Sequence, residues 1–218
     1  MIPMLSAINW TAVGIRAAAI AGALGLWFWT QSLIGRKSVP KEGIGDLAHD
    51  LTSGWHARLA ANTRGANAAL IVSSAFIDLM SLGLIGAAIF GRTLAPFLAI
   101  LLLFGLRQIC QAFSTLPPPP GIIWRHPGFP ALLVTYGVGN DFFFSGHTAL
   151  AVLAAIEAAH LGPVWLAVGV AIVATAEAVL VLILRAHYTL DVVAGALAAY
   201  FAADVAGKLA PVVDAWFR

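Results

Sequence analysis

The chain has few charged residues and a single cysteine. Each of these scarcities limits the classes of protein to which it can belong. Only 10% of its 218 residues are Asp, Glu, Lys or Arg, whereas 61% are hydrophobic and the mean hydropathy is +0.91. A soluble domain carries about a quarter charged residues, so this composition indicates a protein surrounded by lipid. The single cysteine, Cys110, excludes an internal disulfide framework.

Long basic runs are also absent from the sequence, and no cleavable signal peptide is predicted. No basic run exceeds Arg36-Lys37 and the formal net charge is +2, so nucleic acid is not an expected partner. The N-terminus lacks the basic start of a signal peptide, and the first apolar run continues as a span. The sequence has no internal repeat, and we expect one transmembrane domain over residues 1–218. The sequence gives no indication of the oligomeric state. Its membrane would be a bacterial inner membrane or a eukaryotic endomembrane.

The chain does contain a series of long apolar windows. A helix of about 20 apolar residues crosses the hydrocarbon layer of a membrane. The sequence therefore predicts an all-α, polytopic membrane protein with about six transmembrane helices, at residues 17–34, 66–90, 94–113, 145–161, 164–184 and 188–205.

Two segments are too polar to span a membrane. In residues 38–65, an apolar stripe at four-residue steps predicts an amphipathic helix lying in the interface; its members are Leu47, Leu51, Trp55 and Leu59. Residues 115–141 begin with a run of four prolines at 117–120 and are expected to form a loop. Both segments and the adjoining helix ends fall on one membrane face, where function is expected.

Two motifs on that face carry side chains suited to phosphoryl transfer. His187 and Asp191 are four residues apart and share one face of a helix. A carboxylate bonded to one imidazole nitrogen leaves the other nitrogen as a nucleophile. His147 opens another predicted helix, whose N–H groups favour a bound anion. One histidine would attack phosphorus and the other would protonate the leaving oxygen.

Arginine is the side chain whose fork matches phosphate oxygens. The phosphate-binding candidates are Arg107, Arg125 and Arg185, together with Ser145 and Gly146 at the helix start. The spacing of His187 and Asp191 alone also permits a zinc site, but no His-Glu-x-x-His motif or cysteine pair accompanies it. Two histidines could also ligate a haem, but the positions of His147 and His187 at helix starts disfavour this. As a further alternative, the side chains of His147, His187 and Asp191 could be structural polar contacts between helices.

Several further residues are candidates for headgroup recognition. An ionisable residue at mid-membrane costs about 3 kcal/mol, so Asp78 and Glu177 either recognise a choline or ethanolamine ammonium or pair with buried polar groups. Phe142 and Tyr188 flank the motifs and suit cation–π contact. Five tryptophans are instead expected in interfacial belts: Trp10, Trp27, Trp29, Trp165 and Trp216. Four histidines are expected to be interfacial and without roles: His49, His56, His126 and His160.

The motifs resemble those of known lipid enzymes. Ser145-Gly146-His147 with His187-x-x-x-Asp191 resembles the type 2 phosphatidic acid phosphatase superfamily. The longer motifs resemble the sphingomyelin synthase branch: Asp141-x-x-Phe144-Ser145-Gly146-His147-Thr148 and His187-Tyr188-Thr189-Leu190-Asp191-Val192. Arg107 followed by Ser114-Thr115-Leu116-Pro117 is similar to that branch and to phosphatidylcholine:diacylglycerol cholinephosphotransferase of plants. The likeness covers residues 66–207.

The resemblance implies a role for each matching residue. His187 would form a phosphohistidine, Asp191 would orient it, and His147 would serve as acid and then as base, without a metal or cofactor. Asp141 would bind the headgroup or orient an arginine. The Lys-x6-Arg-Pro motif of the phosphatases is absent, since Ala48 stands seven residues after Lys41. Val181 stands where they have an arginine, six before the second histidine. Both departures favour a transferase.

The expected function is therefore transfer of phosphocholine or phosphoethanolamine from a phospholipid donor to a lipid alcohol acceptor, either ceramide or diacylglycerol. The competing functions are those of a lipid phosphate phosphatase or headgroup hydrolase with the same triad, and of a degenerate relative that only binds lipid. The excess of Lys and Arg on the motif face predicts a cytoplasmic site, whereas the resembling families imply the exoplasmic or lumenal side.

Overall fold

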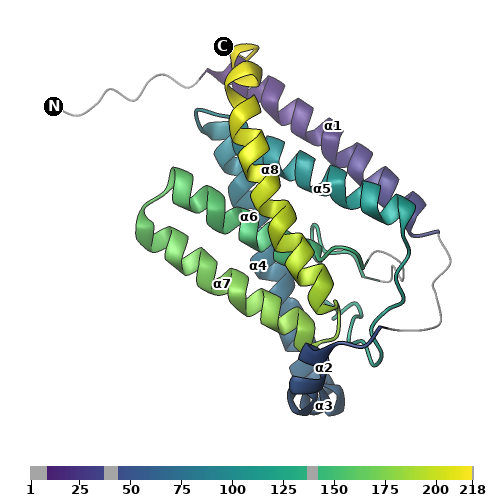
Figure 1. The fold of residues 1–218 in the computed structure, drawn as a ribbon. Coiled ribbons are helices and arrows are strands. Elements are labelled where there is room, and N and C mark those ends of the chain that lie inside the picture. Colours follow the sequence, from purple (N-terminus) through teal and green to yellow (C-terminus); the bar gives the residue numbers. More distant parts are fainter. Residues whose placement is uncertain (1–8, 37–43, 137–141, 218) are drawn as a thin grey trace.

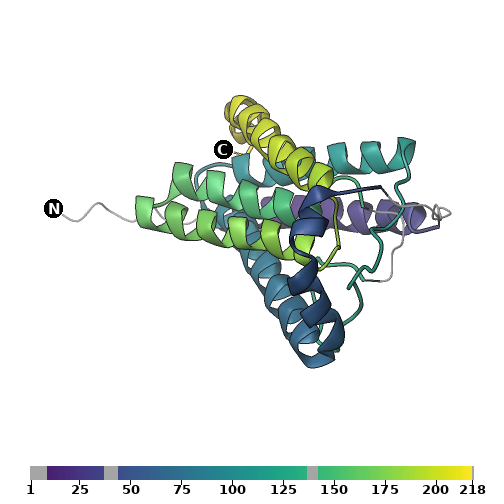
Figure 2. The same cartoon turned by 60° about the horizontal axis from the view of Figure 1, so that its bottom comes forward.

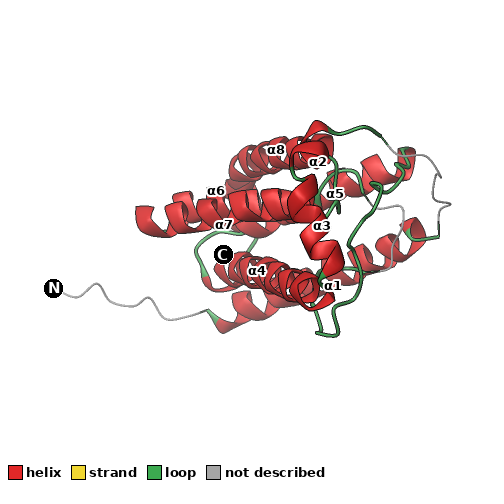
Figure 3. Ribbon diagram, turned by 90° about the horizontal axis from the view of Figure 1, so that it is seen from below, coloured by secondary structure: helices red, strands yellow, loops and turns green. Residues whose placement is uncertain are grey.

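The regular structure is helical throughout the residues described by the computed structural model, which are 9–36, 44–136 and 142–217 (Figure 3). The elements in these ranges are α1 (Trp10–Ile34), α2 (Leu47–Leu51), α3 (Ser53–Ala61), α4 (Thr63–Phe90), α5 (Ala95–Phe113), α6 (Gly146–Leu161), α7 (Val164–Ile183) and α8 (Thr189–Ala215). The prediction of an all-α chain is confirmed for this part of the protein.

Five of these helices, α1, α4, α5, α7 and α8, are long and apolar enough to cross a membrane. The protein is accordingly a polytopic membrane protein. The sixth predicted span, α6, has only 16 residues, about 24 Å of helix against about 30 Å of hydrocarbon. It begins at the Ser145 cap and ends before Gly162 and Pro163, so five helices of spanning length and one shorter apolar helix replace the expected six.

The largest difference in bounds concerns α8, which continues ten residues past the predicted end of its span at residue 205. Lys208 lies in this extension and forms an exposed ion pair of 2.6 Å with Asp204, one helical turn earlier, at the end of the predicted span. Charged residues paired in this way are compatible with a helix. α8 therefore runs the full height of the bundle (Figure 1).

α6 lies in the middle of the packing. It contacts α4, α5, α7 and α8, whereas α1 lies against α4 and α5 at the side of the bundle (Figures 1 and 2). The contact between α6 and α8 uses small side chains, because Ala149 and Ala151 on α6 and Ala199 and Ala202 on α8 are fully buried. Small residues let helix backbones approach closely. The first turn of α6 is thereby held inside the bundle.

Connections gather at one end of the molecule, as predicted. The end of α5, the start of α8 and the short helices α2 and α3 lie there, whereas α1 begins and α8 ends at the opposite end (Figure 1). The expected single interfacial helix is broken at Thr52 into α2 and α3. Its apolar residues Leu47, Leu51 and Trp55 are exposed, while Leu59 is half-buried against α4.

Candidate active site

The turn between α7 and α8 determines where His187 lies. α7 ends in a Schellman motif: Arg185 has a left-handed φ of 53°, Ala186 N donates to Val181 O at 2.9 Å, and Arg185 N donates to Leu182 O at 3.0 Å. These bonds satisfy carbonyls at the helix end and reverse the chain. His187 therefore follows directly on the turn, two residues before α8 begins.

The start of α6 is attached to the first turn of α8 through the backbone. Ser145 N donates to the carbonyl of Asp191 at 3.0 Å. Gly195, one turn further along α8, lets the two segments touch, since a Cβ atom there would lie 2.7 Å from Ser145 O. The two motifs, about forty residues apart, are in this way fixed side by side.

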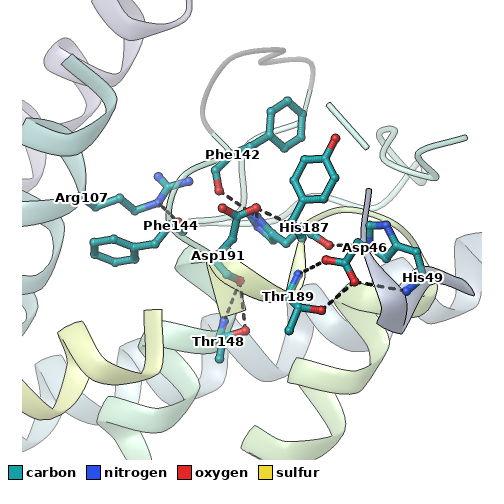
Figure 4. A network of polar contacts seen from close by, with 11 residues as sticks. Asp46, His49, Arg107, Phe142, Phe144, Thr148, His187, Thr189 and Asp191 are labelled. Carbon is teal, nitrogen blue, oxygen red and sulfur yellow. Dashed lines mark hydrogen bonds and ion pairs between the residues drawn. The ribbon is translucent and has the colours of Figure 1, made fainter. Parts of the chain in front are cut away.

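His187 has a defined tautomer. Its Nδ1 atom lies 2.9 Å from the carbonyl oxygen of Phe142 (Figure 4). A carbonyl oxygen only accepts, so Nδ1 carries the hydrogen and Nε2 keeps its lone pair. Asp191 Oδ2 is 3.7 Å from Nδ1, longer than a hydrogen bond, and accepts from Tyr188 N at 2.9 Å. The Phe142 carbonyl thus makes the hydrogen bond that the sequence assigned to Asp191.

His147 and His187 line the same cavity, which has a volume of about 50 Å³. The His147 side chain is buried, and its Nε2 atom makes no hydrogen bond within the described part of the chain. The ring of Trp124 packs edge-on against it, with centroids 5.1 Å apart and planes at 86°. The structure therefore brings together the two histidines that the sequence paired, and Asp191 lies behind one of them.

Arg107, near the end of α5, is the candidate arginine that lines this cavity. Its Nε atom donates to the Phe144 carbonyl at 2.8 Å, and its guanidinium packs under Gly146, where an added Cβ would come within 3.4 Å of Nε. Gly146 also lines the cavity. Ser145 does not, because its buried hydroxyl caps α6 by contact with Thr148 N and Oγ1 at 3.3 and 3.1 Å.

The other two candidate arginines point elsewhere. Arg125 is exposed and donates from Nη2 to Asn67 Oδ1 at 3.0 Å. Arg185 donates from Nη1 to the Pro120 carbonyl at 2.9 Å and so fastens the proline loop to the end of α7. Neither side chain lines the cavity of the two histidines.

The two aromatic candidates, Phe142 and Tyr188, lie in different places. Phe142 lines the cavity, and its ring meets the ring of His187 at 72° with centroids 6.3 Å apart. Tyr188 is buried but faces the segment before α2: its hydroxyl accepts from Ile44 N at 2.9 Å. Of this pair, Phe142 alone is placed to meet a group held between the histidines.

The acidic candidates in the spans are paired with protein groups. Asp78 accepts from the backbone N–H groups of Leu132 and Leu133 at 2.7 and 3.0 Å, which anchors the long loop on α4. Glu177 is buried on α7 and accepts from Ser73 Oγ at 2.6 Å. These contacts correspond to the interpretation in which the carboxylates pair with polar groups. Asp141 lies outside the described residues.

Three residues that the sequence did not assign to the site contact the chain around His187. His49 and His56 are buried, and they contact the carbonyls of His187 and Ile183, each at 2.9 Å. Both side chains are thus buried against the protein backbone, whereas the sequence predicted interfacial residues without roles. Asp46 accepts from Thr189 N and from Thr189 Oγ1, the latter at 2.8 Å (Figure 4).

The pKa of Asp46 reflects these contacts. Partial burial raises this pKa, but the hydrogen bonds from Thr189 and the charge of His49 outweigh it, and the pKa falls below the usual 3.8. An Asp directly before a helix is a recognisable N-cap signal in a sequence. Nothing local in the sequence connects this residue with Thr189, 143 positions away.

A second, apolar cavity of about 190 Å³ adjoins the first. It is formed mainly by α1, α4 and α5, and the two share the lining residues Trp27, Phe104, Leu133 and Leu150. Trp27, which the sequence assigned to an interfacial belt, packs against Phe104 with ring centroids 5.3 Å apart. An apolar volume therefore lies directly beside the histidines. No cluster of three metal-ligating side chains occurs among the described residues.

The chain matches a known protein family. A family model described as AtPDCT1/2 matches residues 45–208, which is more than half of the chain. The matched range contains both histidine motifs, Arg107 and the segment from Asp46 to His56. The comparisons with curated proteins and with solved structures gave no match.

Proposed function

Because the chain belongs to the AtPDCT1/2 family of phosphatidylcholine:diacylglycerol cholinephosphotransferase-like proteins, we propose that it moves phosphocholine from phosphatidylcholine to diacylglycerol. We further propose a metal-independent mechanism through a phosphohistidine, as in the resembling sphingomyelin synthase branch of the type 2 phosphatidic acid phosphatase superfamily. The same reaction could use phosphoethanolamine as the transferred group or ceramide as the acceptor.

The observation that carries this proposal is the hydrogen bond from His187 Nδ1 to the Phe142 carbonyl. It leaves the Nε2 lone pair as the nucleophile, and His187 lines the cavity that His147 and Arg107 also line. In the first step Nε2 attacks the phosphorus of phosphatidylcholine and a P–N bond forms. The bond from phosphorus to the diacylglycerol oxygen breaks, and His147 gives a proton to that oxygen. Burial lowers the pKa of His147 to about 3, so we propose that it takes up this proton when the anionic phosphate lies beside it.

The second step reverses the first with a new alcohol. The hydroxyl of the incoming diacylglycerol gives its proton to His147 and attacks phosphorus, and the P–N bond to His187 breaks. Arg107 would stabilise the negative charge on the phosphoryl oxygens, since its guanidinium is fixed beside the cavity. Asp191 would stabilise the positive imidazole ring of the phosphohistidine across 3.7 Å.

Transfer requires the intermediate to meet a lipid alcohol before water. Two features support this outcome. His147 is buried in the bundle at the start of the short helix α6, and the adjoining apolar cavity offers a route for a lipid chain. Hydrolysis by the same triad is the competing reaction, and it would release phosphocholine or phosphate instead of a new lipid.

Lipid-product analysis tests the proposal. Purified protein in vesicles receives phosphatidylcholine with a deuterated choline group, together with diacylglycerol whose acyl chains are absent from the donor. Mass spectrometry is expected to find the deuterated headgroup on the lipid that carries the new acyl chains. Parallel reactions replace diacylglycerol by ceramide, or phosphatidylcholine by phosphatidylethanolamine. His187→Ala is expected to abolish the product. His160→Ala, which changes an exposed histidine at the other end of α6, is expected to retain it. Deuterated phosphocholine without a new lipid would establish hydrolysis.

A further inference from the structure

The segment from Ile44 to His56 is fastened to the turn that carries His187, although it lies more than 120 residues earlier in the chain. Figure 2 shows α2 beside the end of α7 and the start of α8. Four side chains make the polar contacts. Those of His56 and His49 reach the carbonyls of residues 183 and 187, that of Asp46 reaches residue 189, and that of Tyr188 reaches Ile44 N.

Two of these contacts hold the backbone at His187 and immediately after it. His49 Nε2 lies 2.9 Å from the His187 carbonyl, so it must donate, since a carbonyl oxygen only accepts. Two residues further along, the Asp46 carboxylate receives the N–H and the hydroxyl of Thr189. Thr189 is the first residue of α8, and its N–H has no partner within the helix. The backbone of residues 187–189 is therefore held from outside the α7–α8 turn.

Asp46 and His49 are themselves held in place. Asp46 caps α2, because Oδ1 also accepts from Ala48 N at 2.9 Å and from His49 N at 3.3 Å. The His49 ring packs against the Tyr188 ring with centroids 5.6 Å apart. One short helix thus presents a carboxylate and an imidazole to the turn. Neither side chain lines the cavity shared by His147 and His187.

We propose that Asp46 and His49 are positioning residues for His187. By fixing the backbone from the His187 carbonyl to Thr189, they keep Nδ1 on the Phe142 carbonyl and hold Nε2 toward the cavity. This inference rests on the proposed phosphotransfer at His187, but the position and tautomer of the ring can be measured without turnover.

Substitutions at His49 separate positioning from general stability. His49→Phe keeps the ring and its contact with Tyr188 but removes the donor, whereas His49→Gln keeps an N–H group at about the same reach. We expect His49→Phe to lower kcat roughly tenfold or more, with KM unchanged, because small displacements of reacting groups cost up to about 10²-fold. His49→Gln is expected to recover most of the rate. His160→Phe, at an exposed histidine, serves as the matched control.

A readout independent of activity completes the test. In ¹⁵N spectra of histidine-labelled protein, His187 of the wild type is expected to show a hydrogen on Nδ1 only. His49→Phe is expected to give a mixture of tautomers, and Asp46→Asn a smaller shift in the same direction. If His49→Phe does not fold, His49→Asn, which is too short to reach the carbonyl, replaces it in the comparison with His49→Gln. If the variant without the donor has the wild-type rate and unchanged spectra, the inference is overturned. If the wild type shows the expected spectra but transfers no headgroup, only the proposed reaction is refuted.

Discussion

The Nδ1 atom of His187 donates to the backbone carbonyl of Phe142 at 2.9 Å, and this contact links the two motifs of the site. Phe142 lies just before the Ser145 cap of α6, and His187 lies just before α8. A main-chain acceptor cannot change its protonation, so it specifies the tautomer of the ring at every pH at which the ring is neutral. The fold of the 142–145 segment thus sets the tautomer of the proposed nucleophile, and the role proposed for the Asp191 carboxylate is that of a nearby negative charge.

Asp191→Asn is expected to separate these two contributions. The amide oxygen can still accept from Tyr188 N, so the start of α8 should keep its structure. The charge 3.7 Å from the imidazole is lost, and we expect kcat to fall by about 10²- to 10³-fold with little change in KM. Steady-state kinetics of lipid exchange measure this. A wild-type kcat in the variant would show that the charge has no part in the reaction.

Arg107→Lys is expected to impair the site much more than Arg125→Lys. Lysine lacks both the Nε donor to the Phe144 carbonyl and the planar fork for phosphoryl oxygens. We expect kcat to fall roughly 10²-fold. Arg125→Lys changes an exposed arginine outside the cavity and should leave kcat unaltered. The two variants are compared in the same exchange assay, and similar rates would remove Arg107 from the proposed site.

Gly195→Ala tests the contact between the helices that carry the motifs. The added Cβ atom would lie 2.7 Å from Ser145 O, a backbone atom that cannot move alone. We expect a loss of about 1–3 kcal/mol in unfolding free energy, together with a lower kcat. Gly207→Ala, on the same helix, meets no atom within 4 Å and is the matched control. Equal thermal stability of the two variants would contradict the close approach.

The contribution of Asp46 to stability depends on pH in a defined direction. Its pKa in the folded protein lies below the usual 3.8, so its contribution is fully present above that value and is lost as the pH falls through the folded-state pKa. Asp46→Asn is therefore expected to lower Tm at pH 7, with a difference from wild type that shrinks below about pH 4. Thermal unfolding between pH 7 and pH 3 measures this difference. A constant difference in Tm would show that the ionised carboxylate is not its cause.

Local patterns were sufficient for much of the fold and for the proximity of His187 and Asp191. The four-residue spacing predicted that the two side chains lie close together, and they are 3.7 Å apart, although Asp191 lies on α8 and His187 precedes this helix by two residues. The Gly162-Pro163 pair marked the end of α6 at the predicted residue. Hydrophobic length alone did not distinguish α6 from a full span, since its buried position inside the bundle depends on its neighbours.

The remaining features depend on contacts between distant residues. Arg107, Arg125 and Arg185 are chemically identical in the sequence, and the path of the chain decides that Arg107 reaches the cavity. The contacts of Asp46 with Thr189 and of His49 with His187 join positions 143 and 138 residues apart. No helical period or motif spacing records such a contact, so these side chains were indistinguishable from surface residues of an amphipathic helix.

The most direct test of the account is detection of the covalent intermediate. Purified protein is incubated with phosphatidylcholine in the absence of added acceptor, digested at alkaline pH to preserve P–N bonds, and analysed by mass spectrometry. We expect phosphocholine on the peptide that contains His187, and we expect this adduct to disappear, with formation of new phosphatidylcholine, when diacylglycerol is added. Transfer to diacylglycerol without any adduct on His187, or an adduct on a different residue, would contradict it.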